Sequence, residues 1–198
     1  MHSTDSFMAV PMKRIAIILV VGMLSASTLL LASQNPPPKV PQSAADLSGL
    51  HDFDLLIGEW RVHHRVLKAG KWLEFDGTSS NRKVMDGWGN VEDNVLDSPT
   101  GAYHAVGLRS YDAKTGQWAI WWLDGRTPHG PLDPPVKGRF VNGVGDFYSD
   151  DTLDGKPIRV RYQWSNITAS SARWEQAYSS DAGKTWATNW VMEFRRAQ

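Results

Sequence analysis

The chain of 198 residues carries 21 basic and 21 acidic side chains, so its formal net charge is zero, and 41% of its residues are hydrophobic. This length and composition are typical of one globular domain with a core of its own. A neutral chain lacks the basic surface that phosphate binding requires, so we expect neither nucleic acid nor an anionic membrane as its main partner. The absence of cysteine excludes disulfides and a thioether-linked lipid anchor.

The N-terminal segment has the pattern of a secretory signal peptide. Lys13 and Arg14 precede an uncharged, largely apolar stretch over 15–32 that ends in small residues suited to cleavage. We therefore expect residues 1–33 to be removed and the mature protein to be periplasmic or secreted, with no stable insertion in the membrane. An uncleaved helix that anchors the protein is the alternative. Because the signal pattern begins directly at Met12, this methionine is a candidate for the true start.

A proline-rich linker and one helical segment precede the predicted domain. Residues 34–45 contain four prolines, which indicate an extended tether. The folded domain is therefore expected over 46–198. The one helical candidate, 43–56, comes before the first predicted strand, and we expect it to cap an end of the fold.

From residue 59 onward, short runs rich in Trp, Val, Ile and Tyr alternate with turns rich in Gly and Asp. The turn at 112–116 and the dipeptides Asn142-Gly143 and Asp154-Gly155 make neighbouring strands antiparallel. No segment after residue 60 has a sustained helical period, so crossover helices are not expected. The sequence predicts about ten strands in meander order. The predicted runs are 59–67, 71–76, 80–86, 90–96, 102–111, 117–123, 136–141, 144–149, 157–165, 171–179 and 186–196.

Alternation along the strands separates apolar from charged side chains. In the first strand Trp60, Val62 and His64 share one face, while Arg61 and Arg65 share the other. The same split recurs in later strands, with the charges expected on the outer face. A closed barrel buries one face of every strand and leaves no edge unpaired. The predicted fold class is therefore all-β: a single antiparallel meander β-barrel with a short N-terminal helical cap.

The chain contains ten tryptophans, and the inward set is too bulky and aromatic for a tight aliphatic core. We therefore expect a cavity that accepts a flat apolar ligand, with a few polar side chains to orient it. For each tryptophan, including the further wall candidate Trp118, core packing is the alternative. The predicted ligand-binding residues are Trp60, His64, Trp122, Tyr162, Trp164, Trp174, Gln176, Tyr178 and Trp190.

Gly58-Glu59-Trp60 at the start of the first strand, with Arg195 and Arg196 at the end of the last, resembles the calycin superfamily, which includes lipocalins and fatty-acid-binding proteins. In that superfamily the tryptophan closes the barrel floor and a basic residue of the final strand packs across it. A cation over an indole face in a partly buried site contributes about 1 kcal/mol. The resemblance implies a lipocalin-like barrel.

A longer run, 53–60, together with Trp174-Glu175-Gln176-Ala177 and Asn189-Trp190, resembles a bacterial family of unknown function with a lipocalin-like fold, over about residues 50–196. That resemblance implies a fold and no assigned activity. The haem-binding nitrobindins are similar in outline, but they ligate iron through a histidine in the C-terminal part of the barrel. This chain has no histidine after His129. We therefore expect no haem and no other cofactor.

The histidines give no metal site by their spacing. Adjacent strand residues face opposite sides, so His63 and His64 do not chelate one ion from inside the barrel. His64 is expected inside, either as a satisfied polar group or as a ligand contact or general base. His104, on a face with Val106 and Leu108, poses the same choice.

Ser179 to Trp186 fits the Ser-x-Asp-x-Gly-x-Thr-Trp pattern of the Asp-box, a turn in which the Asp side chain holds backbone amides. A propeller would need several copies and a longer chain, so a single copy predicts a well-formed hairpin before the last strand.

The acidic residues give no enzymatic pattern. We expect Asp86, Glu92, Asp93 and Asp124 to be solvated carboxylates near turns. The Pro- and Gly-rich segment 126–135 is either a lid over the barrel mouth or a long connection.

Three functional hypotheses follow. The first is an exported barrel that binds a small hydrophobic or aromatic molecule. The second is an enzyme on the same scaffold, with His64 as acid or base and a tyrosine as its partner. The third is a structural or interaction module whose own tryptophans fill the barrel. The sequence contains no Gly-x-Ser-x-Gly, no metalloprotease His-Glu-x-x-His and no Gly-rich phosphate loop that opens a helix, which favours binding over catalysis.

Overall fold

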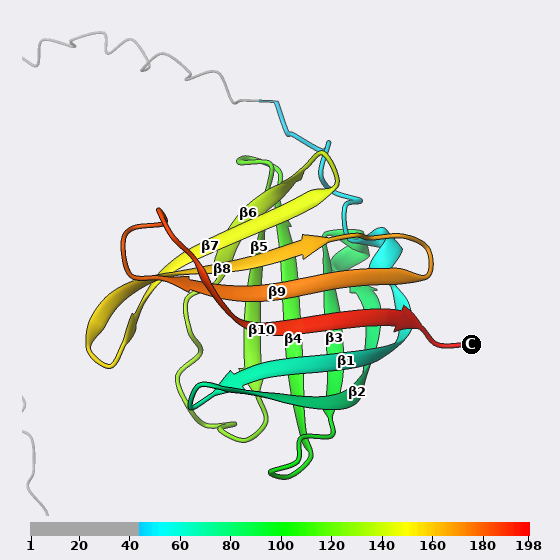
Figure 1. The fold of residues 1–198 in the computed structure, drawn as a ribbon. Helices are drawn as coiled ribbons and strands as arrows, with labels where there is room; N and C mark the ends of the chain where they lie inside the picture. The colour runs from blue at the N-terminus through cyan, green and yellow to red at the C-terminus, as the bar shows by residue number, and fades with distance from the viewer. Residues whose placement is uncertain (1–43) are drawn as a thin grey trace, which may run out of the picture. The chain divides into compact units, whose positions relative to one another are not determined.

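The computed structural model describes residues 44–198, which form a closed barrel of ten antiparallel strands (Figure 1). Consecutive strands are hydrogen-bonded neighbours, and the first pairs with the last. The predicted fold class, an all-β antiparallel meander barrel, is therefore confirmed. Its elements are η1 (Asp54–Leu56), β1 (Gly58–Lys68), β2 (Lys71–Val84), η2 (Met85–Gly87), β3 (Gly89–Leu96), β4 (Tyr103–Asp112), β5 (Gln117–Asp124), β6 (Val136–Val141), β7 (Val144–Leu153), β8 (Lys156–Ser165), β9 (Ser171–Ser179) and β10 (Ala187–Arg196), where η marks a 3-10 helix.

The predicted signal peptide, 1–33, lies outside the described residues, as does most of the predicted linker, 34–45. Within 44–198, no helix is long and apolar enough to cross a membrane. The signal and linker boundaries therefore stay predictions.

The two predicted strands 71–76 and 80–86 are one strand, β2. The Gly-Thr-Ser segment between them, 77–79, resembles a turn in sequence, but Gly77 pairs with Val62 of β1 and with Leu96 of β3. A Cβ atom at Gly77 would lie 2.3 Å from the backbone oxygen of Val95 and 3.0 Å from Nε2 of His64. The glycine is needed for this close approach inside a continuous strand.

The segment before β1 caps one end of the barrel, but it is not the α-helix predicted over 43–56. Its described part contains turns and only the 3-10 helix η1. Tryptophans of the barrel bind its carbonyl groups: Nε1 of Trp118 donates to the oxygen of Gly49 over 2.9 Å, and Nε1 of Trp60 donates to that of Leu56 over 2.7 Å. The irregular backbone is thus held by barrel side chains.

Phe53 places an aromatic ring at the centre of the capped end. It makes edge-to-face contacts with Trp118 at 5.0 Å and with Trp164 at 6.1 Å between ring centroids. Nearby, the guanidinium carbon of Arg196 lies 4.2 Å from the ring centroid of Trp60. The predicted pairing of the first-strand tryptophan with a basic residue of the last strand is therefore confirmed.

The turns confirm the antiparallel predictions. Asn142 and Asp154 have φ angles of 51°, and each is followed by a glycine with positive φ, as tight hairpins require. In the Asp-box, Oδ1 of Asp181 accepts hydrogen bonds from the Thr185 amide over 2.9 Å and from the Ser179 hydroxyl over 2.7 Å. The single Asp-box is a hairpin device, as predicted.

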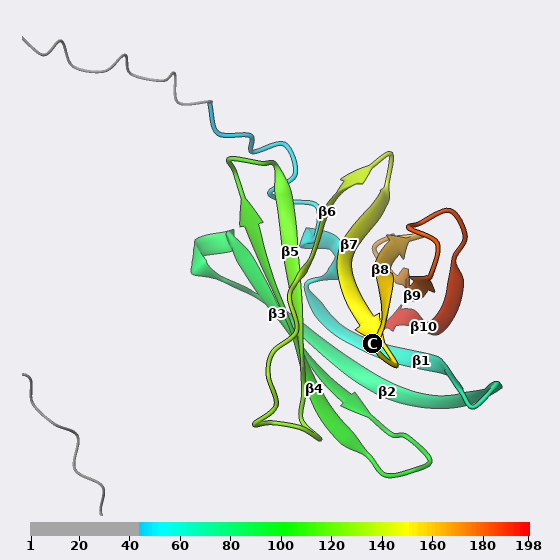
Figure 2. The ribbon, with the colours of Figure 1, turned by 90° about the vertical axis from the view of Figure 1, so that its left-hand side faces the viewer.

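The barrel therefore has two different ends (Figure 2). The capped end is where β1 begins and β10 ends. At the opposite end, which we call the open end, the strands are joined by two tight turns and by the loops 97–102, 125–135 and 180–186.

Candidate functional site

A cavity of about 320 Å³ lies at the open end of the barrel. Strands β5 to β10 and the loop 125–135 contribute to its wall. Five predicted ligand-binding residues line this open-end cavity: Trp122, Tyr162, Gln176, Tyr178 and Trp190. Asp133 and Pro134 of the loop also line it, so this segment forms part of the cavity wall.

Its aromatic wall is an interlocked set of rings. Trp190 makes edge-to-face contacts with Trp122 at 5.7 Å and with Trp174 at 5.5 Å between ring centroids. Tyr162 contacts Trp174 in the same manner at 4.9 Å. Such pairs stabilise each other beyond the burial of their area and fix the ring orientations. The wall is therefore preformed.

Polar groups on β8 and β9 face the same space. Nε2 of Gln176 donates to the hydroxyl oxygen of Tyr178 over 3.0 Å and to Oδ1 of Asn189 over 2.9 Å. Burial raises the pKa of Tyr162 far above its usual value, and burial likewise raises the pKa of Tyr178. Both phenols are therefore neutral at physiological pH. Tyr162 is paired through its backbone with β7 and β9, but its hydroxyl makes no hydrogen bond within residues 44–198 and faces the cavity.

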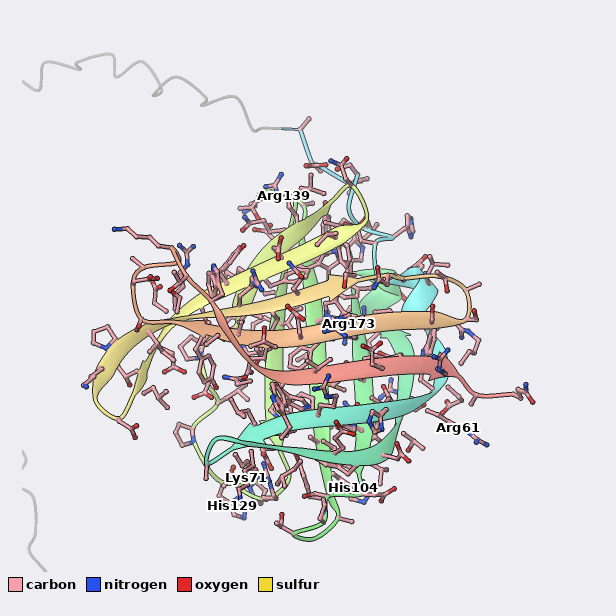
Figure 3. All side chains as sticks on the ribbon, viewed as in Figure 1. Arg61, Lys71, His104, His129, Arg139 and Arg173 are labelled. Atoms are coloured by element: carbon pink, nitrogen blue, oxygen red, sulfur yellow. The ribbon has the colours of Figure 1, made fainter. Side chains whose placement is uncertain are left out.

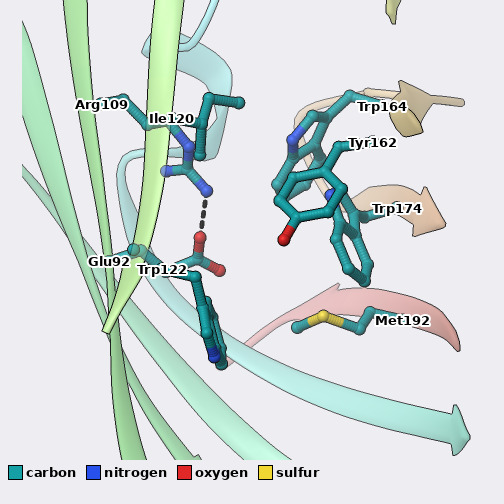
Figure 4. Close-up of a pocket in the computed structure, with 9 residues that line it drawn as sticks. Glu92, Arg109, Ile120, Trp122, Tyr162, Trp164, Trp174 and Met192 are labelled. Carbon is teal, nitrogen blue, oxygen red and sulfur yellow. Dashed lines mark hydrogen bonds and ion pairs between the residues drawn. The ribbon is translucent and has the colours of Figure 1, made fainter. Parts of the chain in front are cut away.

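A smaller cavity, with room for about one water molecule at about 20 Å³, continues toward the barrel interior. It shares Ile120, Trp122 and Tyr162 with the open-end cavity. Figure 4 shows Arg109 and Glu92 on one side of this inner cavity and Tyr162, Trp164 and Trp174 on the other. The two spaces thus meet at the same three side chains.

Glu92 and Arg109 form an ion pair that is almost wholly buried, with side-chain exposures of 5% and 2%. Nη2 of Arg109 binds Oε2 of Glu92, and the Ser79 hydroxyl donates to Oε1 over 3.0 Å. Nη1 of Arg109 donates to Oδ1 of Asn81 over 3.0 Å and to Oδ1 of Asn90 over 2.8 Å. Strands β2, β3 and β4 therefore place a connected polar network inside the barrel.

This network corrects two predictions. Glu92 is not a solvated carboxylate near a turn, and not all charges take the outer face. On β3 the polar residues Asn90, Glu92 and Asn94 are buried, while Val91 and Val95 are only partly buried. The rule that the face with the apolar residues points inward therefore gives the wrong inward face for this strand. The network could have been found only from the facing polar residues of three neighbouring strands.

Two donors at the inner cavity have no acceptor within the described chain. They are Nε1 of Trp164 and Nε of Arg109. The two residues are 3% and 2% exposed. The indole nitrogen of Trp164 is directed toward the cavity (Figure 4). An unpaired buried donor costs free energy, about 1–3 kcal/mol in mutational data. A hydrogen-bond acceptor in the cavity would offset that cost.

His64 lies behind this wall. It is 1% exposed, stacks on Phe75 at 4.8 Å between centroids, and accepts a hydrogen bond at Nδ1 from Nε1 of Trp190 over 3.3 Å. Burial lowers its pKa to about 4, with a further lowering by His63. It is therefore neutral, with its proton on Nε2. His64 lines neither the inner nor the open-end cavity.

The remaining predicted ligand-binding residues lie either at the inner cavity or at the capped end. Trp164 and Trp174 line the inner cavity. Trp60 lines neither cavity, since it is packed at the capped end, as is the wall candidate Trp118. The structure thus brings seven of the nine predicted residues together around the two adjacent cavities and places Trp60 and His64 elsewhere.

The prediction that His104 faces inward is wrong. His104 is exposed on β4, at the open end of the barrel (Figure 3), and Leu108 on the same face is 38% exposed. The inner face of β4 carries Ala105, Gly107 and Arg109 instead. Among residues 44–198, no group of three or more His, Asp or Glu side chains is arranged to hold a metal ion.

Comparisons with known proteins give similarity of fold only. No family model and no curated protein matches the chain. It is similar to a redesigned β-barrel with 8% identity and a TM-score of 0.43, over 75% of this chain and 96% of that one. It is also similar to a protein of unknown function from the DUF3598 family of Nostoc punctiforme, with 10% identity and a TM-score of 0.40. That match covers 73% of this chain and 48% of the other. The resemblance to the calycin superfamily therefore stays a prediction.

Proposed function

We propose that this protein is an exported barrel that binds a small molecule with an aromatic or apolar body in the open-end cavity. The observation that carries the proposal is the cavity of about 320 Å³ with its preformed aromatic wall. Small-molecule sites are concave, largely apolar and preformed, with a few polar groups that fix orientation. The edge-to-face tryptophans provide the apolar surface, and Tyr162, Gln176 and Tyr178 provide the polar groups.

The inner cavity supports a defined orientation of the ligand. It has room for about one small group, and it is lined by Tyr162 and by Trp164, whose indole N–H has no acceptor within residues 44–198. A ligand oxygen at this point would accept a hydrogen bond from this indole, while the ring system occupies the wider space near Trp122 and Trp190. This arrangement would satisfy buried donors only in the bound state.

The cavity also bears on the other two hypotheses. A barrel filled by its own tryptophans would have no such space. An enzyme that uses His64 requires contact between this side chain and the substrate, but Trp190 lies between them. We therefore favour binding.

Export rests on the sequence of residues 13–33. A charged start followed by an uncharged apolar stretch is the pattern of a cleaved secretory signal. N-terminal sequencing of the protein from its own host tests this. A mature N-terminus shortly after residue 33 would support export, whereas a chain that retains the apolar stretch would contradict cleavage.

Native mass spectrometry of the protein purified from its own host tests the binding function. We expect a stoichiometric adduct of a small molecule. A matched pair of variants locates it: Trp122→Ala removes a wall of the cavity, while Trp121→Ala removes the neighbouring indole, which does not line it. Adduct occupancy should fall for Trp122→Ala and persist for Trp121→Ala. An unliganded mass, both as isolated and after incubation with host extract, would contradict the proposal.

A further inference from the structure

The charges around the open-end cavity are unbalanced. Its lining includes Asp124, Asp133, Asp150 and Asp151 and contains no Lys, Arg or His. Asp124 is neutralised, because Arg126 donates to its carboxylate over 2.6–3.2 Å. No ion-pair partner of Asp133 or Asp151 exists within residues 44–198. The cavity therefore carries net negative charge.

That charge reaches the polar groups of the wall. Burial raises the pKa of Tyr162 and of Tyr178, and the negative charges of Asp133 and Asp151 raise both further. The same field that disfavours a phenolate would favour a positive charge placed nearby. The two carboxylates and the two hydroxyls thus share one electrostatic environment.

The aromatic wall adds a second attraction for positive charge. Trp122 and Trp190 line the cavity together with Tyr162 and Tyr178. A cation within about 6 Å of such a ring centroid is attracted by the negative face of the ring, most strongly for tryptophan. Among residues 44–198, the acidic groups are not arranged as a metal site. A diffuse organic cation fits a wide, aromatic, negatively charged space better than a compact metal ion does.

We propose that the ligand of the open-end cavity is an organic cation, with its aromatic or apolar body against Trp122 and Trp190 and its ammonium group near Asp133 and Asp151. This inference rests on the proposed binding function and names its ligand class. The same charges disfavour anionic ligands of the same shape.

Three probes with one body and different end groups test the charge requirement. They are 2-phenylethylammonium, which is cationic at neutral pH, neutral 2-phenylethanol, and anionic 3-phenylpropionate. Binding to the full-length protein is measured by isothermal titration calorimetry at low ionic strength. We expect the cation to bind about tenfold more tightly than the alcohol, the anion to bind most weakly, and added salt to weaken only the cation.

Variants assign the effect to the carboxylates. The double variant Asp133→Asn/Asp151→Asn removes both charges with little change of shape. It should weaken the cation about tenfold and leave the alcohol unchanged. The variant Asp93→Asn is the matched control, because it removes an exposed carboxylate of β3 that does not line the cavity. The reversed variant Asp133→Lys/Asp151→Lys should prefer the anion.

The outcomes separate the two proposals. Equal affinity for all three probes, unchanged in the Asn variant, would overturn the cation inference and leave the binding function standing. Failure of all three to bind at millimolar concentration would overturn both. Loss of cation affinity in Asp93→Asn as well as in the double variant would contradict the assignment to the cavity carboxylates.

Discussion

Nε1 of Trp190 donates a hydrogen bond to Nδ1 of His64 over 3.3 Å, which ties a wall of the open-end cavity to a buried histidine behind it. The imidazole also stacks on the ring of Phe75, and the angle between the two ring planes is 14°. Protonation of Nδ1 would remove the acceptor of Trp190 and place a charge in an apolar setting. The wall therefore depends on a neutral His64.

This relationship predicts a loss of stability in acid. The pKa of His64 is lowered by burial from 6.5 to about 4 in the folded protein. Between these values the unfolded chain binds more protons, so stability falls as pH falls from 6.5 to 4. The loss from this residue is about 3 kcal/mol. In His64→Asn, whose side chain can still accept from Trp190, urea unfolding should lack this contribution. An identical pH dependence in the two proteins would contradict it.

A second prediction concerns the capped end. Arg196 stacks on Trp60 and donates to the backbone oxygen of Ile57 over 3.0 Å and to that of Leu55 over 2.7 Å. Arg196→Ala should lower the free energy of unfolding by about 2 kcal/mol, because it removes a cation–π contact and charged hydrogen bonds. Arg195→Ala, at an exposed neighbour on β10, is the control and should change stability little. Equal effects of the two substitutions would count against the Trp60 contact.

Much of the fold could be predicted from local pattern. Alternation on β1 and β8, and on β10 from Trp190 onward, gives the inward faces correctly, because there most inward residues are apolar. The pairing of Trp60 with Arg196 follows from a short motif at the two ends of the domain. The helix predicted before β1 fails because Trp60 and Trp118 bind its carbonyl groups. The contact of Trp118 with Gly49 joins residues far apart in the chain and leaves no local signal.

The site could be predicted only on one side. The wall from β5 and β8–β10 is aromatic, so an excess of tryptophan points to it. The facing strands carry Glu92 and Arg109 inward, which a rule that puts charges outside excludes. These side chains are buried because they satisfy each other, and this depends on the register of β3 with β4, where Glu92 lies opposite Gly107. Register across strands is a tertiary property.

A third prediction concerns the close packing of β2 against β3 at Gly77. Gly77→Ala would place a methyl group 2.3 Å from the oxygen of Val95 and against His64. We expect a loss of about 2 kcal/mol or more in unfolding free energy, because backbone atoms of two paired strands must move. Gly107→Ala is a milder control, since its Cβ would meet only the Glu92 side chain, at 3.2 Å. Equal stability of wild type and Gly77→Ala would refute the close approach.

The buried ion pair gives the last prediction. Removing one partner leaves the other charge buried without compensation, so Arg109→Met or Glu92→Leu alone should destabilise the barrel by about 3–5 kcal/mol. The double variant should recover much of this loss, because two apolar side chains leave no unpaired charge. The exposed pair Arg65–Glu74, at 3.1 Å, is the control, and Glu74→Gln should cost about 1 kcal/mol or less. Urea unfolding of the four variants measures these values. If the double variant is as unstable as the sum of its single variants, the pair does not act as a unit and the inner polar network requires another explanation.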